Sequence, residues 1–492
     1  MSQPPQPPQY GYPPQQPSSA PMPPLVHAPT HPSAAAVPPP PAPGSGPGRP
    51  AWRKPALIAL VLALVLAGGG WALWSFLGGD ASRDGKPAAK EKKSAAGSVV
   101  WTADSRTKPD DKSMKSALGT WFTSSLVVKA EPDMVTAYDI VTGEKKWSFL
   151  LKGSLCAASR ESEGNVAVLA AEFGDGCLDL MAIDLRDGHR IWEELLVEEK
   201  EADDALKPRK WGKSGLELAL NDRHVYATWT TGEQTRRLND GKRVEQEKHD
   251  KCEMVDSAGG ERLISVNYCG TRDITLRSLD PRKLDKPKWS RNLDRNEGFV
   301  TIVSTNPLVL TQAPGKGGRD SRYDFVVLDP DSGEEKARVA YNSYWMLGTC
   351  FLATSGCTGP LVDKGTNTLY VSGKGVTMAY NLADGKERWT HKADSNRYTM
   401  PLAVRNGQLA AYTVATSDRR GRMTYLDAST GKAVRTVEHS DADRDRRNEA
   451  MMSKIEGFPR LVGDRLLLVN DGGFEDDQAG MIYAISAPAK ED

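Results

Sequence analysis

The strongest candidate for metal chemistry in this chain is one acidic run. Asp441, Asp443, Asp445 and Glu449 alternate within SDADRDRRNEAMM, and alternating carboxylates can bind Ca²⁺. An EF-hand loop starting at Asp441 would need Gly at its sixth position and Glu at its twelfth, where this run has arginine and methionine. Three arginines would also compensate its charge, so the run is expected to be a solvated loop. Residues 470–480, NDGGFEDDQAG, are interpreted as a turn between strands.

Other chemistry has less support. The sequence contains no G-x-S-x-G, no phosphate-binding G-x-x-x-x-G-K-[ST] and no H-E-x-x-H. Five histidines lack ligand spacing and are expected at the surface: His189, His224, His249, His391 and His439. The 64 basic and 64 acidic residues cancel, which argues against nucleic acid as a partner. We therefore predict no catalytic, cofactor-binding or metal site, and no enzyme.

The N-terminal region differs in composition from the rest. Residues 1–50 hold 19 of the 33 prolines and no charged residue before Arg49, which predicts a disordered tail with local polyproline II structure. The tail either docks on aromatic grooves of partner domains or has no dedicated partner.

An uncharged segment follows the tail. Residues 56–79 are long enough to span about 30 Å of hydrocarbon as a helix, and Trp71 and Trp74 suit the membrane interface. We expect one transmembrane helix here, rather than a cleaved signal peptide or a buried core helix. Residues 80–96 then form a Lys/Ala-rich stalk.

Topology is predicted from the cysteines, because Lys and Arg flank the apolar segment on both sides. All six follow the segment and no C-x-x-C is present, which favours disulfides in an oxidising compartment over a zinc site. The tail is thus expected in the cytoplasm and the remainder outside the cell membrane. The cysteines are Cys156, Cys177, Cys252, Cys269, Cys350 and Cys357.

The rest of the chain is built from a repeat. AYDIVTGEKKW, AIDLRDGHRIW and AYNLADGKERW occupy residues 137–147, 182–192 and 379–389, and weaker copies lie between and beyond them. Each reads as a strand, a tight turn with Asp and Gly, and a strand that opens near a Trp. The turns recur at roughly 44 to 53 residues, which suits about four strands per unit and predicts propeller blades.

The two ends of the repeat region complement each other. The last unit stops after three strands, whereas GSVVWTADS at residues 97–105 is a Trp-bearing strand with nothing before it. Placing residues 99–101 beside residues 482–485 closes a ring without open sheet edges. We predict an all-β, eight-bladed propeller over residues 97–492, with seven blades as the alternative.

The pattern A-x-D-x-x-x-G-x-x-x-W resembles the tryptophan-docking repeat of quinoprotein-type, or PQQ-like, β-propellers over residues ~97–492. The resemblance implies that each Trp packs between neighbouring blades and is structural. Dehydrogenases of this kind carry pyrroloquinoline quinone, Ca²⁺ and a vicinal disulfide, but this chain has no adjacent cysteines, so no cofactor is expected. The structural positions are Trp101, Asp139, Gly143, Trp147, Asp184, Gly188, Trp192, Trp289, Asp329, Gly333, Gly385, Trp389, Asp427 and Gly431.

The blade frame also suggests disulfide partners. Cys156 with Cys177 and Cys252 with Cys269 each lie early in a blade, and Cys350 with Cys357 would close a short loop. We predict sequential pairing, with three to six free thiols as the alternative.

The expected function is non-catalytic protein binding or scaffolding by a membrane-anchored propeller outside the cell. The composition is similar to that of actinobacterial envelope proteins, and within the propeller family the closest analogue is an outer-membrane assembly lipoprotein. Two alternatives are a quinone- or Ca²⁺-dependent oxidoreductase and an extracellular ligand sensor that signals through the Pro-rich tail.

Overall fold

The computed structural model divides the chain into two units, Met1–Ala89 and Lys90–Asp492, and every described residue lies in the second. The described residues are 96–104, 119–201, 204–207, 215–249, 252–269, 273–294, 300–312, 323–341, 359–393, 397–454, 457–470 and 480–487. The expected tail, transmembrane helix and stalk up to residue 95 lie outside them. Among the helices in these ranges, none combines the length and apolar character that a membrane crossing needs.

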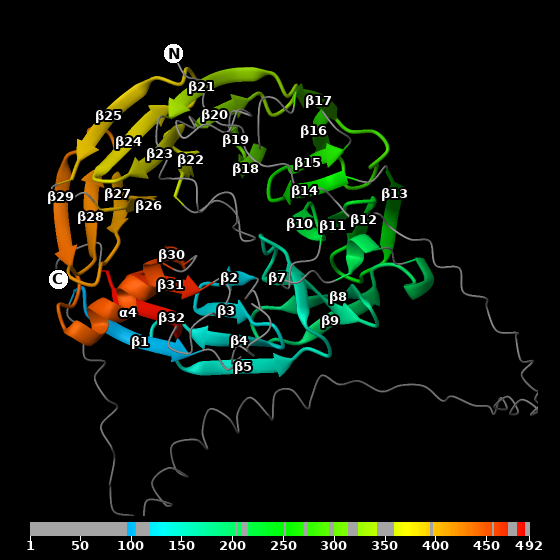
Figure 1. Ribbon diagram of the computed structural model, residues 1–492, viewed down its shortest axis with the longest axis horizontal. Coiled ribbons are helices and arrows are strands. Elements are labelled where there is room, and N and C mark those ends of the chain that lie inside the picture. The colour runs from blue at the N-terminus through cyan, green and yellow to red at the C-terminus, as the bar shows by residue number, and fades with distance from the viewer. Residues whose placement is uncertain are drawn as a thin grey trace, which may run out of the picture. The chain divides into compact units, whose positions relative to one another are not determined.

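Within these ranges the chain forms eight antiparallel sheets of four strands each, arranged as a ring of blades (Figure 1). Blades 1 to 4 follow in chain order. Blade 1 contains β2 (Thr120–Phe122), β3 (Leu126–Ala130), β4 (Met134–Asp139) and β5 (Lys145–Leu150); blade 2 contains β6 (Leu155–Ala158), β7 (Val166–Phe173), β8 (Gly176–Asp184) and β9 (Arg190–Leu195). Blade 3 contains β10 (Glu217–Asn221), β11 (His224–Trp229), β12 (Gly232–Arg237) and β13 (Arg243–Lys248); blade 4 contains β14 (Cys252–Ala258), β15 (Leu263–Cys269), β16 (Asp273–Leu279) and β17 (Trp289–Asp294).

The second half of the ring repeats the plan. Blade 5 contains β18 (Val300–Thr305), β19 (Leu308–Gln312), β20 (Tyr323–Leu328) and β21 (Glu335–Tyr341); blade 6 contains β22 (Leu361–Asp363), β23 (Thr368–Gly373), β24 (Val376–Asn381) and β25 (Glu387–Lys392). Blade 7 contains β26 (Thr399–Arg405), β27 (Gln408–Thr413), β28 (Arg422–Asp427) and β29 (Ala433–Glu438). Blade 8 contains β30 (Gly457–Val462), β31 (Arg465–Asn470), β32 (Gly480–Ser486) and β1 (Val99–Asp104).

Blade 8 closes the ring by joining the two ends of the propeller region. β1 pairs with β32 in antiparallel register, with Val99 opposite Ile485 and Ala103 opposite Ile482. The prediction of an eighth blade built from both ends is therefore confirmed, and the seven-bladed alternative is wrong. The pairing gives the last blade a fourth strand from the beginning of the region.

The middle strands of the blades are buried on both faces, because each sheet is packed between two neighbours. All nine residues of β8 and all six of β23 are buried. This explains why runs such as VAVLAA, at residues 166–171 of β7, are continuously apolar rather than alternating. The outer strands are more exposed, as β5 and β25 illustrate.

The contact that recurs between blades is a tryptophan packed against a glycine of the next blade. A Cβ added to any of these glycines would lie between 2.4 and 2.7 Å from the nearest atom of the tryptophan. Four of the indole N–H groups also donate to a backbone oxygen in that turn, at 2.7 to 3.0 Å. The docked pairs are Trp101–Gly143, Trp147–Gly188, Trp192–Gly241, Trp289–Gly333 and Trp389–Gly431.

The Asp of the repeat shapes the turn that holds this glycine. Oδ1 of Asp139 accepts hydrogen bonds from the N–H groups of Val141 and Thr142, and the N–H of Gly143 donates to the Asp139 carbonyl at 2.9 Å. Asp329 and Asp427 repeat this arrangement, and Asp184 repeats it with one backbone donor to Oδ1, the N–H of Arg186. The structural roles predicted for the repeat residues thus follow from one local motif.

Three interfaces lack the tryptophan, and a different contact joins the two blades at each of them. Glu245 takes its place between blades 3 and 4 and accepts a hydrogen bond from the N–H of Leu284, reversing the polarity of the indole contact. Between blades 5 and 6 the position is Ala337, and the backbone oxygen of Arg338 instead approaches Gly385, where a Cβ would lie 2.5 Å away. Between blades 7 and 8, Arg435 lies over the Tyr425 ring at 4.9 Å, and the Tyr425 hydroxyl donates to Ala487 O at 2.9 Å; this residue ends the described part of blade 8.

A pair of glycines in blade 7 tests the docking contact. Gly431 (φ 70°) faces Trp389, whereas Gly407 (φ 73°) has nothing within 4 Å of an added Cβ. We expect Gly407→Ala to cost about 1 kcal/mol of unfolding free energy through backbone conformation alone. Gly431→Ala adds a clash with the indole and should cost roughly 1–3 kcal/mol more. Chemical denaturation measures both, and equal losses would show that the docking contact contributes nothing.

The turn carboxylates predict a dependence of stability on pH. The hydrogen bond from Lys336, followed by those from the N–H groups of Asp331 and Ser332, holds the pKa of Asp329 well below its usual range. The Ser429 and Thr430 side chains lower the pKa of Asp427 in the same way. Since the folded pKa lies below the unfolded one, each carboxylate stabilises the fold above about pH 4, and this contribution is lost as pH falls through the folded pKa.

The double variant Asp329→Asn, Asp427→Asn should therefore lose less stability on acidification than the unaltered chain. Urea unfolding midpoints measured from about pH 5 to about pH 2 test this. Parallel curves for the two proteins would contradict the assignment.

Candidate functional site at helix α4

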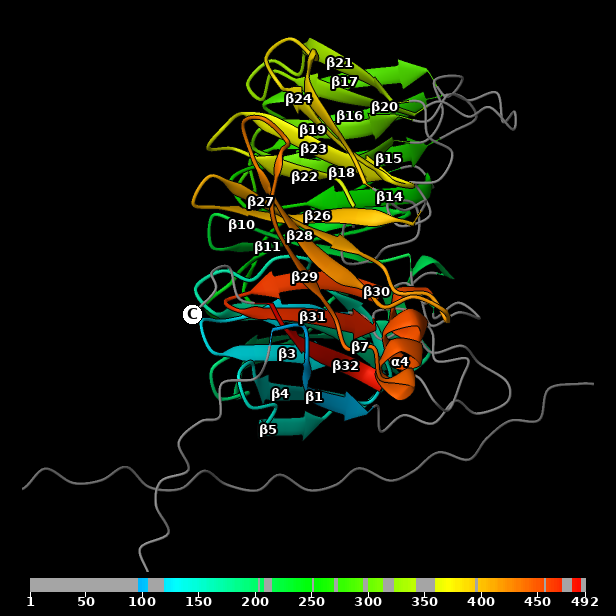
Figure 2. The same ribbon diagram turned by 90° about the vertical axis from the view of Figure 1, so that its left-hand side faces the viewer.

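Helix α4 (Asp443–Lys454) connects blade 7 to blade 8 and packs against β30, β31 and β32. In Figure 2 it lies at the end of these strands, on one side of the ring. It is formed by the acidic run that the sequence suggested to be a solvated loop, and that expectation is wrong. The described residues of the other expected turn, Asn470 and Gly480, end β31 and begin β32, while residues 471–479 lie outside the described part of the chain.

The charges of the run are arranged to favour a helix. Asp443 and Asp445 lie in its first turn, where carboxylates interact favourably with the helix dipole. Asp443 pairs with Arg446 at 2.7 Å and with Arg447 one turn along the helix. The Ser440 hydroxyl donates to Asp445 at 2.7 Å just before the helix. The alternation of Asp and Arg that the sequence showed is thus a set of local ion pairs.

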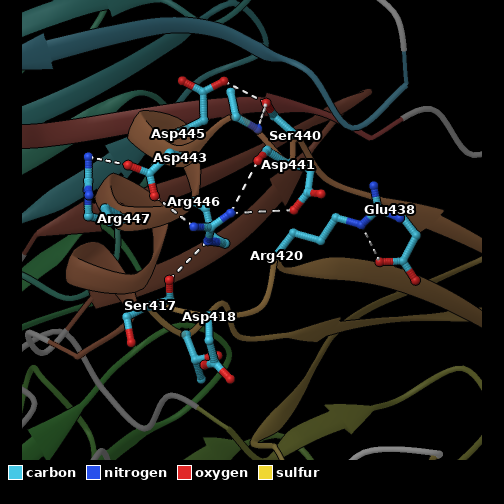
Figure 3. A network of polar contacts seen from close by, with 12 residues as sticks. Ser417, Asp418, Arg420, Glu438, Ser440, Asp441, Asp443, Asp445, Arg446 and Arg447 are labelled. Atoms are coloured by element: carbon cyan, nitrogen blue, oxygen red, sulfur yellow. Dashed lines mark hydrogen bonds and ion pairs between the residues drawn. The ribbon is translucent and has the colours of Figure 1, made fainter.

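Arg446 links the helix to blade 7, as Figure 3 shows. Its Nε donates to the Ser417 carbonyl at 3.0 Å, in the connection between β27 and β28. Its Nη1 donates to the Asp441 carbonyl at 3.2 Å and pairs with that residue's carboxylate at 3.6 Å. One guanidinium therefore holds the start of α4 and the neighbouring loop together.

The inner side of α4 carries a buried polar cluster. Oε1 of Glu449, a residue only 2% exposed, accepts a hydrogen bond from the Tyr412 hydroxyl at 2.8 Å and lies 2.8 Å from Nδ1 of His439. The Tyr412 and His439 rings stack with centroids 5.8 Å apart. Gly421 leaves room for the carboxylate, since a Cβ there would lie 1.8 Å from Oε1. These buried hydrogen bonds fix the position of α4 against blade 7.

The outer side of α4 borders a hollow of about 310 Å³. Trp101, Thr102 and Asp104 of β1 form one wall, and Asn448 and Met451 of α4 form the other. Tyr483 lies between them, and burial together with the nearby Asp445 and Glu449 raises the pKa of its hydroxyl. The hollow offers both apolar and polar contacts beside the outermost strand of blade 8.

Exposed charge extends from this hollow along the helix. Arg444 lines it and is exposed, as is Arg447 one turn further on. The arrangement offers mixed apolar and charged contacts of the kind that suit a polypeptide segment.

Two groups of described side chains have the spacing to hold a metal ion. In the first, the buried Asp184 is already paired with Arg186, and the exposed Asp187 is paired with His189. The second is His249 with Cys252 and Cys269. The carboxylates of α4 belong to neither.

The predicted disulfides are confirmed at two of three places. Cys156 bonds to Cys177 between β6 and β8, and Cys252 bonds to Cys269 between the paired strands β14 and β15. Cys350 and Cys357 lie outside the described residues. The repeat residues are distributed around the ring at the blade contacts and do not gather into one site.

The expectation that all five histidines lie at the surface is wrong for His439, which is 2% exposed because its ring stacks on Tyr412 beside Glu449. Sequence reasoning also missed the His439–Glu449–Tyr412 cluster and the position of His249. The spacing of ten residues between His439 and Glu449 gave no signal while the run was taken as a loop. His249, three residues before Cys252, could have been noticed as a neighbour of a disulfide.

The fold and its docked turns define an eight-bladed propeller of PQQ-like repeats. The chain belongs to the family described as outer membrane protein assembly factor BamB, whose family model matches residues 90–247 and 272–482. A search of curated proteins gives no match.

Three solved structures are similar to this chain at low identity. BamB from Moraxella catarrhalis is 14% identical, with 78% of this chain and 100% of that chain covered and a TM-score of 0.44. Quinohemoprotein alcohol dehydrogenase from Comamonas testosteroni is 12% identical, with 80% and 77% covered and a TM-score of 0.46. A europium-containing methanol dehydrogenase is 11% identical, with 79% and 93% covered and a TM-score of 0.45. Similarity at this level carries no argument about activity.

The buried carboxylate predicts how α4 is held. We expect Glu449→Ala to cost about 3 kcal/mol, because it removes the acceptor that Tyr412 and His439 share in a buried site. Glu449→Gln keeps an oxygen acceptor and should cost much less. Asp443→Asn, at an exposed pair, is the control and should cost under about 1 kcal/mol. Thermal unfolding measures all three; a loss for Glu449→Ala no larger than the control's would contradict the account.

Proposed function

We propose that this protein is a non-catalytic binding or scaffolding module that recognises a protein partner through α4 and the hollow beside β1. The observation that carries this proposal is the combination of a firmly held helix with an open, mixed-polarity outer side. Glu449 and Arg446 tie α4 to blade 7, while Arg444, Asn448 and Met451 face the hollow. A rigid surface of this kind limits the entropy lost on binding.

The partner segment is expected to match this lining. An apolar side chain fits against Trp101 and Met451, and a carboxylate complements the exposed Arg444. The family description, an assembly factor, supports a role in which the propeller joins other proteins rather than transforming a substrate.

The repeat residues support a non-catalytic role as well. The tryptophans and aspartates that give the family its signature are engaged in blade contacts and turns in the described part of the chain. Their side chains make the contacts that join the blades and form the turns.

Membrane anchoring and placement outside the cell remain part of the proposal. Residues 56–79 are the proposed anchor, with the Pro-rich residues 1–50 in the cytoplasm. The two disulfides support an oxidising compartment for the propeller. Labelling of single introduced cysteines with a membrane-impermeant reagent tests the topology; labelling of the tail in intact cells would contradict it.

Site-specific photo-crosslinking in cells tests the binding surface. A photoreactive residue at position 448 should give a discrete crosslinked protein, because this position faces the hollow. The same residue at position 386, an exposed turn of blade 6, is the control and should give none. Arg444→Glu should remove at least 80%, or about 1 kcal/mol, of the position-448 product by reversing the charge.

Equal crosslinking at both positions, or a product insensitive to Arg444→Glu, would contradict the proposed surface. Calorimetry with pyrroloquinoline quinone and Ca²⁺ tests the non-catalytic part separately. Micromolar or tighter binding of that pair would support an oxidoreductase instead.

A further inference from the structure

A second feature stands apart from α4, at the junction of blades 3 and 4. His249 follows the end of β13, and Cys252 and Cys269 lie opposite each other on β14 and β15. His249 and Cys269 line a hollow of about 310 Å³. This is an interface where no tryptophan is docked, and Glu245 takes its place.

The three side chains are close enough to share one ion. Nδ1 of His249 lies 3.5 Å from Sγ of Cys252, and the ligand atoms of all three residues lie within 4.8 Å of one another. Tetrahedral zinc with Zn–S near 2.3 Å and Zn–N near 2.0 Å places its nitrogen and sulfur ligands about 3.5 Å apart. The imidazole is therefore already at the separation that coordination requires.

We propose that Cys252, Cys269 and His249 form a redox-gated site for a thiophilic d¹⁰ cation, Zn²⁺ or Cu⁺. In the disulfide form the sulfurs are bonded to each other and the site is closed. Reduction opens it and supplies two thiolates and one imidazole, a ligand set suited to these ions. A fourth ligand, such as water, reaches the ion from the hollow.

A dithiol is the reductant that opens the site by reducing the Cys252–Cys269 disulfide. One thiolate of the dithiol attacks a sulfur of the protein disulfide and forms a mixed disulfide, which releases the first cysteine. The second thiol of the dithiol then attacks the mixed disulfide and releases the second cysteine. The S–S bond of the protein breaks, the reductant becomes a cyclic disulfide, and Cys252 and Cys269 each gain a proton. Metal binding releases these two protons because thiolates are the ligands.

Strand pairing keeps the two cysteines together after reduction. β14 and β15 pair from Met254 opposite Tyr268 to Ala258 opposite Ile264, and after one register shift Cys252 lies opposite Cys269, with the Cα atoms of the cysteines 3.9 Å apart. Cys156 and Cys177 are a natural control, since their Cα atoms are 5.9 Å apart and they belong to no candidate metal group among the described residues.

Cobalt titration of the full-length protein tests the proposal, with Co²⁺ as a spectroscopic probe for Zn²⁺. The chain is reduced with dithiothreitol without oxygen, desalted and titrated. We expect a thiolate-to-cobalt charge-transfer band that saturates at one equivalent and is lost when Zn²⁺ is added. The oxidised protein should show no such band.

Variants locate the ion. His249→Ala leaves the disulfide intact, so its folding can be checked in the oxidised form, and it should weaken cobalt binding at least tenfold. Cys252→Ser should abolish the band, whereas Cys156→Ser should keep it. Absence of the band in the unaltered protein, or its persistence in Cys252→Ser or at full affinity in His249→Ala, would overturn the proposal.

Discussion

The ring depends on the contact between an indole of one blade and a glycine in the turn of the next. The turn brings its backbone against the ring only because the glycine has no side chain, and the preceding Asp fixes the turn by accepting N–H groups. The indole adds a large apolar surface and, at four of five contacts, a hydrogen bond to the same turn. The same short sequence motif therefore forms the turn within a blade and the packing contact between blades.

The interfaces without tryptophan depart from the repeated tryptophan–glycine contact. Glu245 replaces an indole donor by a carboxylate acceptor between blades 3 and 4, and a hollow with a disulfide and His249 lies at the same junction. Between blades 7 and 8, Arg435 occupies the position, and α4 follows directly after blade 7. The tryptophan contacts hold the ring together, and two of the three interfaces without tryptophan lie near the surfaces to which we assign binding.

Much of this fold could be predicted from the sequence, because its motif carries both the turn and the interblade contact. The pairing of β1 with β32 was predicted because the last repeat unit lacks one strand and the repeat region begins with one strand that has no unit of its own. Helix α4 could not be predicted in the same way, since DADRDRRNEAMM reads as a charged loop until the ion pairs of Asp443 are known. Likewise, the site residues His439, Glu449 and Tyr412 come from three separate segments that only the folded ring brings together.

Eight blades form one ring, and Glu449 and Arg446 hold α4 on it. Hydrogen exchange followed by mass spectrometry on the full chain tests this most directly, because pairing with β32 and docking of Trp101 join β1 to the ring. We predict that the β1 amides that face β32 exchange as slowly as those of β32. Free exchange of β1 beside a protected β32 would contradict closure of the ring.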